Sequence, residues 1–171
     1  QAGRYMPEYR AVRKNFKNFL DMCKNSDVCC ELAMQPIDAF DLDVAILFSD
    51  ILTIPDAMGL GVQFLEGEGP VFENPIKTSK DVMDIHTFDP DKLSYVYKAV
   101  SNIKSALPKN IPLIGFSGSP WTLAAYSIEG RSSKSFEFTK NFIKHNEKEA
   151  HIFLQKLTDA CFIYLKKQVF R

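Results

Sequence analysis

The stretch that decides the fold is residues 43–55, which read DVAILFSDILTIP. Within it, residues 44–48 form an unbroken apolar run, whereas a half-exposed strand would alternate apolar and polar residues. An uninterrupted run is typical of a strand that is buried on both faces, as in a parallel sheet covered by helices. The run therefore predicts a core strand over 44–48.

A carboxylate follows this strand directly, at Asp50 in the pair Ser49-Asp50. The carboxyl ends of strands are where α/β sheets and barrels bind ligands. Apolar residues resume at 51–54, and a charge in such surroundings is costly unless something pairs with it. Aspartate is also a common helix N-cap. The pattern thus leaves two interpretations open for Asp50, a helix cap and a functional acid.

Length and composition indicate an ordinary globular protein. The 171 residues are enough for one domain with a full core, so we expect a single domain over 1–171. The chain is 46% hydrophobic and 25% charged, and its 21 basic and 21 acidic residues cancel. Zero net charge argues against a partner such as nucleic acid or an anionic membrane. No apolar run reaches the roughly 20 residues of a membrane span.

A second core strand is predicted over 111–116, IPLIGF, with Pro112 near its first residue. A turn of small residues follows, and Ser119 and Pro120 have the residue types of a helix N-cap and first helical position. The exposed N–H groups at the start of this helix, which follows the strand and its small-residue loop, would favour binding of an anion.

The first twenty residues predict a helix beginning near Pro7. Its apolar stripe consists of Tyr9, Val12, Phe16, Phe19 and Leu20. Its basic face, interpreted as solvated, consists of Arg10, Arg13, Lys14 and Lys17. Arg4 differs because it precedes the helix, where a loop could aim it at a site. The rigid two-pronged fork of arginine suits a carboxylate.

Further helices are predicted over 91–107 and 136–142 and after Asn146, and another starts at an N-cap Ser26 and ends or kinks at Pro36. The four cysteines are Cys23, Cys29, Cys30 and Cys161. They lack the second ligand pair of a zinc site, and the three histidines match no ligand motif, so we expect no metal and interpret the cysteines as reduced thiols.

Two stretches look like known motifs but are rejected. Gly59-Leu60-Gly61 is half a dinucleotide-binding fingerprint, but Phe64 stands at the third glycine position and a strand-like segment follows instead of a helix. Residues 115–119, GFSGS, faintly resemble a hydrolase elbow, but the second glycine is absent and no histidine is placed to help.

Three stretches together resemble the uroporphyrinogen decarboxylase family: QAGRYMPEYR at 1–10, LFSDIL at 47–52 and GFSGSPWTLAAYSIEG at 115–130. CCELAMQPI and IPLIGF also match, so the resemblance covers essentially the whole chain. It implies a (β/α)8 TIM barrel that works as a homodimer without a cofactor. It also implies removal of carbon dioxide from the four acetate side chains of uroporphyrinogen III. The product is coproporphyrinogen III, an intermediate of haem and chlorophyll synthesis.

The resemblance gives Asp50 a catalytic role, in which it accepts hydrogen bonds from the pyrrole N–H groups at the centre of the macrocycle. Its charge can also stabilise a pyrrole that is protonated during decarboxylation. Tyr126 matches a family tyrosine near this acid and the substrate, although helical spacing alone favours a core aromatic. Phe48 and Phe116, at the ends of their strands, would form apolar walls against the macrocycle.

The same resemblance assigns the substrate's peripheral carboxylates to basic residues near the start of the chain. Arg4 and Arg13 match family positions that hold these carboxylates, and the Ala2 backbone belongs to the same binding turn. The family also has an arginine before Gln1, a leading candidate for proton donor, and a serine and a histidine from the second half of the barrel. A complete barrel needs about 250 residues, so we expect an incomplete N-terminal portion that is inactive alone.

Two alternatives from other classes remain open. One is a methyltransferase of the same superfamily, acting on cobalamin or thiols with zinc held by His and Cys. The other is a non-catalytic tetrapyrrole- or carboxylate-binding fragment. The expected compartment is the cytosol, with a plastid-type organelle as the alternative. No signal-peptide pattern is seen at the start, and the opening Gln1 suggests that a natural N-terminus was removed.

Overall fold

The computed structural model describes residues 3–65 and 69–170. Its contacts gather the chain into two units. The first comprises Gln1–Asp50, Leu93–Phe116 and Leu165–Arg171, and the second comprises Ile51–Lys92 and Ser117–Tyr164. Nothing in this division tests whether residues 1–171 are one domain, so that expectation stays a prediction.

The first unit contains a parallel pair of short strands, β1 (Ala45–Ile46) and β4 (Leu113–Ile114). The Ala45 N–H donates to the Pro112 carbonyl at 3.0 Å, and the Leu47 N–H donates to the Ile114 carbonyl at 2.9 Å. Both strands lie inside the predicted ranges 44–48 and 111–116 but are shorter.

The expectation that both faces of these strands are buried is wrong for one face. The register partners Ile46 and Ile114 are 41% and 47% exposed, whereas Ala45 is buried. The reason is that alternate residues of a strand point to opposite faces, and the described residues cover the face with the two isoleucines only in part.

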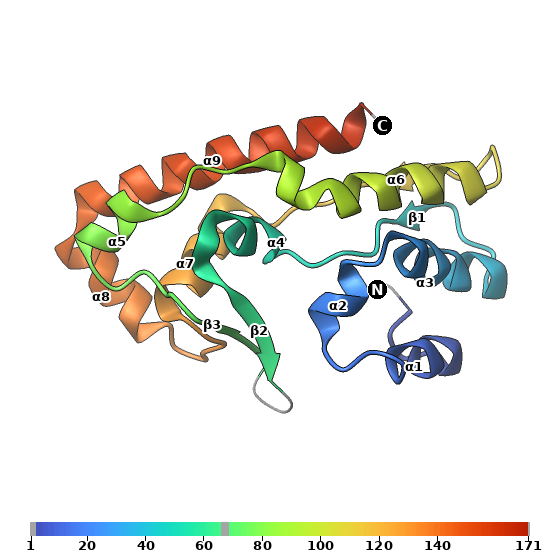
Figure 1. Cartoon of the computed structure of the whole chain (residues 1–171), viewed down its shortest axis with the longest axis horizontal. Helices are drawn as coiled ribbons and strands as arrows, with labels where there is room; N and C mark the ends of the chain where they lie inside the picture. The colour runs from blue at the N-terminus through green and yellow to red at the C-terminus, as the bar shows by residue number, and fades with distance from the viewer. Residues whose placement is uncertain (1–2, 66–68, 171) are drawn as a thin grey trace. The chain divides into compact units, whose positions relative to one another are not determined.

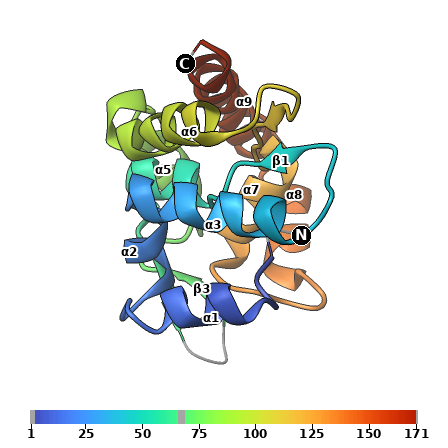
Figure 2. The same ribbon diagram turned by 90° about the vertical axis from the view of Figure 1, so that its right-hand side faces the viewer.

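Two helices provide most of the packing in the first unit, α3 (Ser26–Ala39) and α6 (Ser94–Ala106). They lie side by side in both ribbon views (Figures 1 and 2). Asn102 of α6 donates to Asp27 of α3 at 2.7 Å. The buried face of α6 is the predicted stripe, with Val96, Tyr97, Val100 and Ile103.

The start and end of α3 differ from the prediction. Asn25, not Ser26, is the N-cap, and its side chain accepts from the backbone N–H groups of Asp27 and Val28 at 3.1 Å each. Pro36 lies inside the helix and does not end it. The missing N–H of Pro36 removes a single helical hydrogen bond, and the helix ends within one turn of it.

The single helix predicted near the N-terminus is two helices, α1 (Pro7–Arg13) and α2 (Phe19–Cys23). The prediction of Pro7 in the first turn is confirmed. The break arises because Asn18 starts a new helix: its side-chain oxygen accepts from the Asp21 N–H at 2.7 Å. Phe19 therefore belongs to α2, and the five apolar residues do not form one stripe.

The second unit begins with a short helical segment, α4 (Thr53–Pro55) and the π-helical turn η1 (Asp56–Leu60), followed by a hairpin. The hairpin strands β2 (Val62–Leu65) and β3 (Gly69–Phe72) are antiparallel and lie side by side in Figure 1. Gly59 has a φ of 92°, a conformation that glycine adopts readily, and the strand β2 follows it instead of a helix.

The remaining elements are α5 (Ser79–Asp84), the 3-10 turn η2 (Pro90–Leu93), α7 (Pro120–Glu129), α8 (Glu137–His145) and α9 (Glu147–Val169). The predicted cap of α7 is confirmed, since the Ser119 hydroxyl accepts from the Thr122 N–H at 3.1 Å and Pro120 is the first helical residue. Among the described residues, no helix combines the length and apolar character that crossing a membrane would require.

Candidate active site

The candidate acid, Asp50, lies four residues beyond the end of β1 in the first unit and is half-buried. The residues that lead to it, Leu47, Phe48 and Ser49, are buried. The following helix, α4, has Leu52 as its N-cap residue, two positions after Asp50. The Asp50 carboxylate thus lies beyond the C-terminal end of β1, and this end of the strands is where ligands bind in α/β barrels.

Arg4 lies in a tight turn just before α1. The Met6 N–H donates to the Gly3 carbonyl at 2.8 Å, and Gly3 has a φ of +65°, a conformation that favours glycine. The guanidinium carbon of Arg4 lies over the Phe19 ring, 4.6 Å from its centroid, and 5.7 Å from the Phe48 centroid. Both distances are within the range of a cation–π interaction.

Three rings form an aromatic cluster beside this arginine: Tyr9 of α1, Phe19 of α2 and Phe48. The centroids of Tyr9 and Phe48 are 6.0 Å apart, and those of Phe19 and Phe48 are 6.2 Å apart with the ring planes at 62°. Such tilted and edge-on pairs are the arrangements that aromatic rings prefer. The cluster ties the residue before Asp50 to the first two helices.

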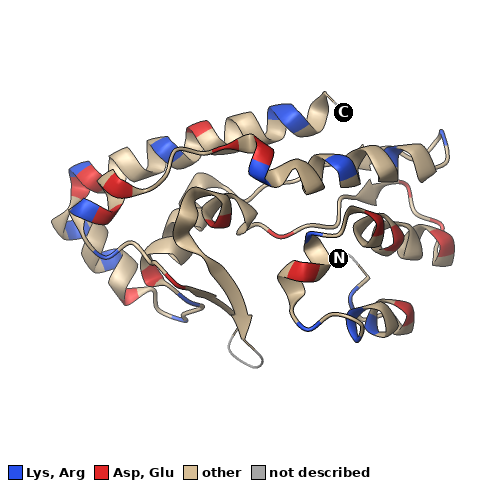
Figure 3. Ribbon diagram, viewed as in Figure 1, with Lys and Arg blue, Asp and Glu red and all other residues tan. Residues whose placement is uncertain are grey.

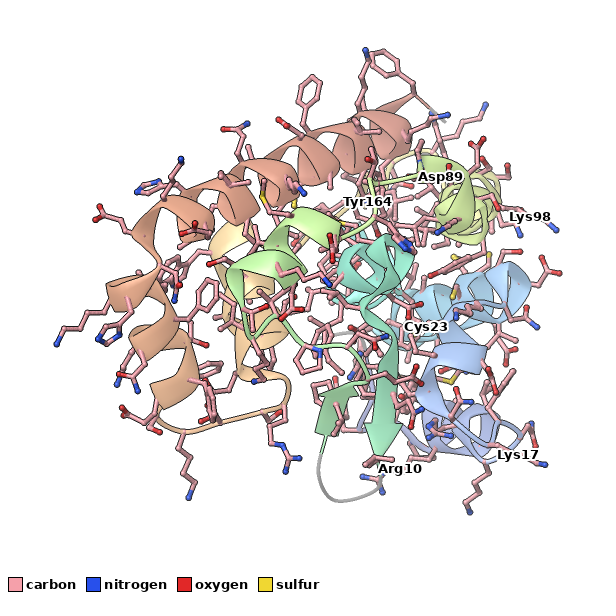
Figure 4. The ribbon with its side chains drawn as sticks, turned by 60° about the vertical axis from the view of Figure 1, so that its left-hand side comes forward. Arg10, Lys17, Cys23, Asp89, Lys98 and Tyr164 are labelled. Carbon is pink, nitrogen blue, oxygen red and sulfur yellow. The ribbon has the colours of Figure 1, made fainter. Side chains whose placement is uncertain are left out.

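The charged candidates of the first unit all act electrostatically on one buried thiol, that of Cys23 on α2. Figure 4 labels this residue. Burial raises the pKa of Cys23 far above that of a free thiol, and the nearby Cys29 thiol and Asp50 carboxylate raise it further. The guanidinium groups of Arg4 and Arg13 act in the opposite direction. Asp50, Arg4 and Arg13 therefore all lie near enough to Cys23 to influence its pKa.

The hydroxyl of Tyr9 is influenced by the same two arginines as Cys23. Burial raises the pKa of its hydroxyl, and the positive charges of Arg4 and Arg13 partly offset this effect. The Tyr9 hydroxyl and the Cys23 thiol are both neutral near pH 7, and the charged groups that influence them are the two arginines and, for Cys23, Asp50. Two guanidinium groups close to this buried region are suited to an anionic ligand.

The basic residues in α1 and just after it separate into two kinds. Arg13 is half-buried, and its Nη1 donates to the Phe16 carbonyl at 2.6 Å, so the interpretation of Arg13 as part of a solvated face is wrong. Arg10 and Lys17 are exposed, as expected of such a face. Figure 3 colours the positions of the basic residues blue along the ribbon of α1, and Figure 4 labels Arg10 and Lys17.

Phe116 also belongs to the first unit and follows β4, as Phe48 follows β1. The side-chain amide of Gln168 holds its backbone on both sides. The Phe116 N–H donates to Gln168 Oε1, and Gln168 Nε2 donates to the Phe116 carbonyl, each at 3.1 Å. This amide replaces the pairing that a neighbouring strand would give, and it fixes the end of β4.

Tyr126 lies on α7 in the second unit and is half-buried. Its ring contacts Phe136 edge-on, with centroids 5.8 Å apart and ring planes at 88°. This contact is that of a packed aromatic residue, and the role of Tyr126 in a site stays a prediction. Ala2 lies outside the described residues, so its expected backbone contact is not tested.

Two site-lining residues were missed by the sequence interpretation, Phe19 and Cys23. Phe19 was hidden because the apolar residues of the first twenty positions were assigned to one helix, and Cys23 was interpreted only as a reduced thiol. The signal that could have found them is Asn18 followed three positions later by Asp21, which resembles a capping box. Because α2 starts at Phe19, the ring of Phe19 does not belong to the apolar stripe of α1.

The described residues contain no group of three His, Cys, Asp or Glu side chains that could hold a metal ion. The cysteines are free thiols, of which Cys23, Cys29 and Cys161 are buried and Cys30 is half-buried. Burial raises the pKa of Cys29 to about 12. The thiols of Cys23 and Cys29 are therefore protonated near pH 7.

Alkylation tests this account of the thiols. Near pH 8, close to the pKa of about 8.5 of a free thiol, iodoacetamide should modify Cys30 first in the native protein and leave Cys23 and Cys29 protected. The raised pKa values keep the latter two protonated until the pH rises well above this range. Peptide mass spectrometry measures each site, and denatured protein serves as the control in which all should react similarly. Equal rates in the native state would contradict the assigned burial.

Comparison with a solved structure first defines the fold class of the chain. A solved structure of a methyltransferase from Methanosarcina mazei superposes with a TM-score of 0.69, covering 89% of this chain and 44% of that chain. The sequence identity is 18%, so this likeness concerns the fold alone. With the family match below, it confirms the predicted fold class, an incomplete (β/α)8 barrel.

The sequence then gives the family. Residues 1–171 match the family described as uroporphyrinogen decarboxylase (URO-D), and the chain belongs to this family. A uroporphyrinogen decarboxylase from Vesicomyosocius okutanii is 56% identical over 169 residues, covering 99% of this chain and 49% of the relative. One from Francisella philomiragia is 53% identical over 171 residues, with the same coverage. The chain thus spans about half the length of the curated relatives that it matches.

Proposed function

We propose that the full-length protein converts uroporphyrinogen III to coproporphyrinogen III by removing carbon dioxide from its four acetate side chains. The observation that carries the proposal is the arrangement around Cys23, where Asp50 at the end of a barrel strand shares its surroundings with Arg4 and Arg13. Membership of the uroporphyrinogen decarboxylase family supports the same reading. The substrate is an octacarboxylate with inward-pointing pyrrole N–H groups, and this arrangement offers the complementary charges.

In the proposed mechanism, a pyrrole ring is first protonated and becomes the electron sink. The bond between the acetate methylene and its carboxylate then breaks, carbon dioxide leaves, and the electron pair flows into the ring. A second proton taken up at the methylene carbon gives the methyl group as the ring loses its extra proton. The net change for each acetate is one proton consumed and one carbon dioxide released. Because the substrate supplies the electron sink, this chemistry requires no cofactor.

Each residue of the candidate site has a role in this scheme. Asp50 accepts hydrogen bonds from the pyrrole N–H groups and stabilises the cationic ring by its negative charge. Arg4 and Arg13 bind peripheral carboxylates, for which the guanidinium fork is suited. Phe48 and Phe116 form apolar walls against the macrocycle. Tyr126 is proposed as a further contact to substrate, and a homodimer in the cytosol is the proposed working form.

The direct test is an assay of carbon dioxide release and coproporphyrinogen formation by the full-length protein, run beside a binding titration with uroporphyrin. Turnover would support the enzyme, whereas binding without turnover would support a tetrapyrrole-binding protein. Zinc analysis of the same sample distinguishes the methyltransferase alternative, which requires stoichiometric metal. A metal-free protein that releases carbon dioxide from uroporphyrinogen would exclude it.

The arginines give a prediction within this proposal. Arg4→Ala in the full-length enzyme should raise the apparent KM for uroporphyrinogen about 10- to 100-fold, the effect of losing a hydrogen bond to a charged group. Lys17→Ala should change it little, because Lys17 is exposed on the solvated face of this region. Arg10→Ala is the matched control, an exposed arginine on α1. Equal effects of the three substitutions, measured in one buffer, would remove the distinction.

A further inference from the structure

We propose that Phe19 is a positioning residue, whose ring holds the Arg4 guanidinium ready for a carboxylate of the substrate. The inference rests on the proposed function for its substrate and on the geometry for its mechanism. The guanidinium carbon lies over the ring of Phe19 at 4.6 Å from the centroid, closer than to Phe48. Phe19 is 7% exposed, so the ring itself is almost entirely enclosed.

The arginine needs such a support because, in the described part of the chain, only the rings of Phe19 and Phe48 contact its head group, and Phe19 is the nearer of the two. No hydrogen bond or ion pair joins the Arg4 guanidinium to another residue in 3–65 or 69–170. Arg13 differs, since the Phe16 carbonyl occupies one of its N–H groups. Contact through the face of a guanidinium leaves the N–H donors, which lie in its plane, available for a ligand. The ring therefore restrains Arg4 without consuming the groups that recognise carboxylate.

The ring is itself fixed from two sides. Phe19 is the first residue of α2, and the Asn18 cap sets where this helix begins. Its edge packs against Phe48, with centroids 6.2 Å apart, and Phe48 leads to Asp50 through Ser49. A long flexible arginine loses much rotamer freedom on binding, and a fixed platform reduces that loss before substrate arrives. Phe19 thus links the position of the carboxylate-binding arginine to the strand end that carries the acid.

Substitution of the ring tests this role in the full-length enzyme. Phe19→Leu keeps an apolar side chain but removes the π face, and should raise the KM for uroporphyrinogen about 5- to 30-fold with little change in kcat. Phe19→Tyr and Phe19→Trp keep a ring and should restore most of the affinity. Phe142→Leu is the matched control, a phenylalanine of α8 with 6% exposure, and should leave KM unchanged.

A double substitution separates positioning from general packing. If Phe19 acts through Arg4, then Arg4→Ala with Phe19→Leu should be no worse than Arg4→Ala alone. Additive losses in KM would overturn the proposal. So would a Phe19→Leu enzyme that matches the wild type, or one whose loss is confined to kcat.

A nuclear magnetic resonance measurement tests the geometry without substrate. The Arg4 Nε–H proton, assigned by its loss in Arg4→Lys, should be shifted upfield by the ring current of Phe19. The shift should disappear in Phe19→Leu and persist in Phe142→Leu. An unshifted Arg4 signal in the wild type would overturn the stacking itself. Inactivity of the wild type on uroporphyrinogen with the shift present would instead contradict only the proposed function.

Discussion

Asp50→Asn in the full-length enzyme is expected to lower kcat for uroporphyrinogen about 100- to 1000-fold, the loss typical of one well-placed electrostatic group. The amide keeps the shape of the side chain but removes the negative charge that would stabilise a protonated pyrrole. The amide also brings its own N–H donors toward pyrrole N–H groups that need acceptors. Binding should weaken less than turnover, because the peripheral carboxylates still contact the arginines.

The matched control for this substitution is Asp43→Asn. Asp43 lies in the same stretch, before β1 instead of after it, and its side chain is exposed. This control loses the same charge at the opposite end of the strand and should retain wild-type kcat. Circular dichroism and a thermal melt must be similar for both variants and the wild type. An Asp50→Asn enzyme with near wild-type kcat would refute the assignment of Asp50.

The strands and the α7 start could be predicted because their signals are local. An apolar run of five residues has few alternatives to a core strand, and the serine and proline at 119–120 satisfy cap and first-turn geometry by themselves. The lengths of β1 and β4 could not be predicted in this way. Strand length depends on which backbone groups find partners, and only the pairing of two strands with each other is described here.

The candidate site could be predicted only in part, because its charged residues can be recognised in the sequence whereas the contacts between its side chains cannot. Arg4, Arg13 and Asp50 carry charges whose matches to a family are visible in sequence. The contact of Arg4 with Phe19 depends on a helix break near Asn18, where a continuous apolar periodicity masks the new start. The same periodicity made Arg13 look like a solvated residue until its bond to the Phe16 carbonyl was seen. Periodicity describes a face of a helix but cannot locate the end of that helix.

Residues 1–171 expressed alone are expected to aggregate or self-associate and to lack decarboxylase activity. Barrel strands need parallel neighbours on both sides, and a closed barrel leaves no edge bare. In the described part of the chain, β4 pairs with β1 alone. A groove of about 650 Å³ lies beside β4 in the first unit, with mostly apolar residues along it, among them Val100, Leu107, Leu113, Leu165 and Val169.

Exposed apolar side chains support the same expectation. Ile46 and Ile114 lie side by side in register on the open face of the strand pair. Val169 and Phe170, at the end of α9, are 73% and 76% exposed. Open strand edges and contiguous apolar patches promote association with other chains. Catalysis should fail for a separate reason, because the family's second-half serine and histidine are not among these residues.

Light scattering coupled to size exclusion, at several protein concentrations, measures the association, and carbon dioxide release measures activity. The full-length protein is the positive control for both. Replacing Ile46 and Ile114 together by lysine should make the 171-residue chain less prone to associate, because charge on an open strand pair opposes edge-to-edge pairing. It should restore no activity. A soluble monomer of residues 1–171 that melts cooperatively and releases carbon dioxide from uroporphyrinogen would show that this half of the barrel is self-sufficient.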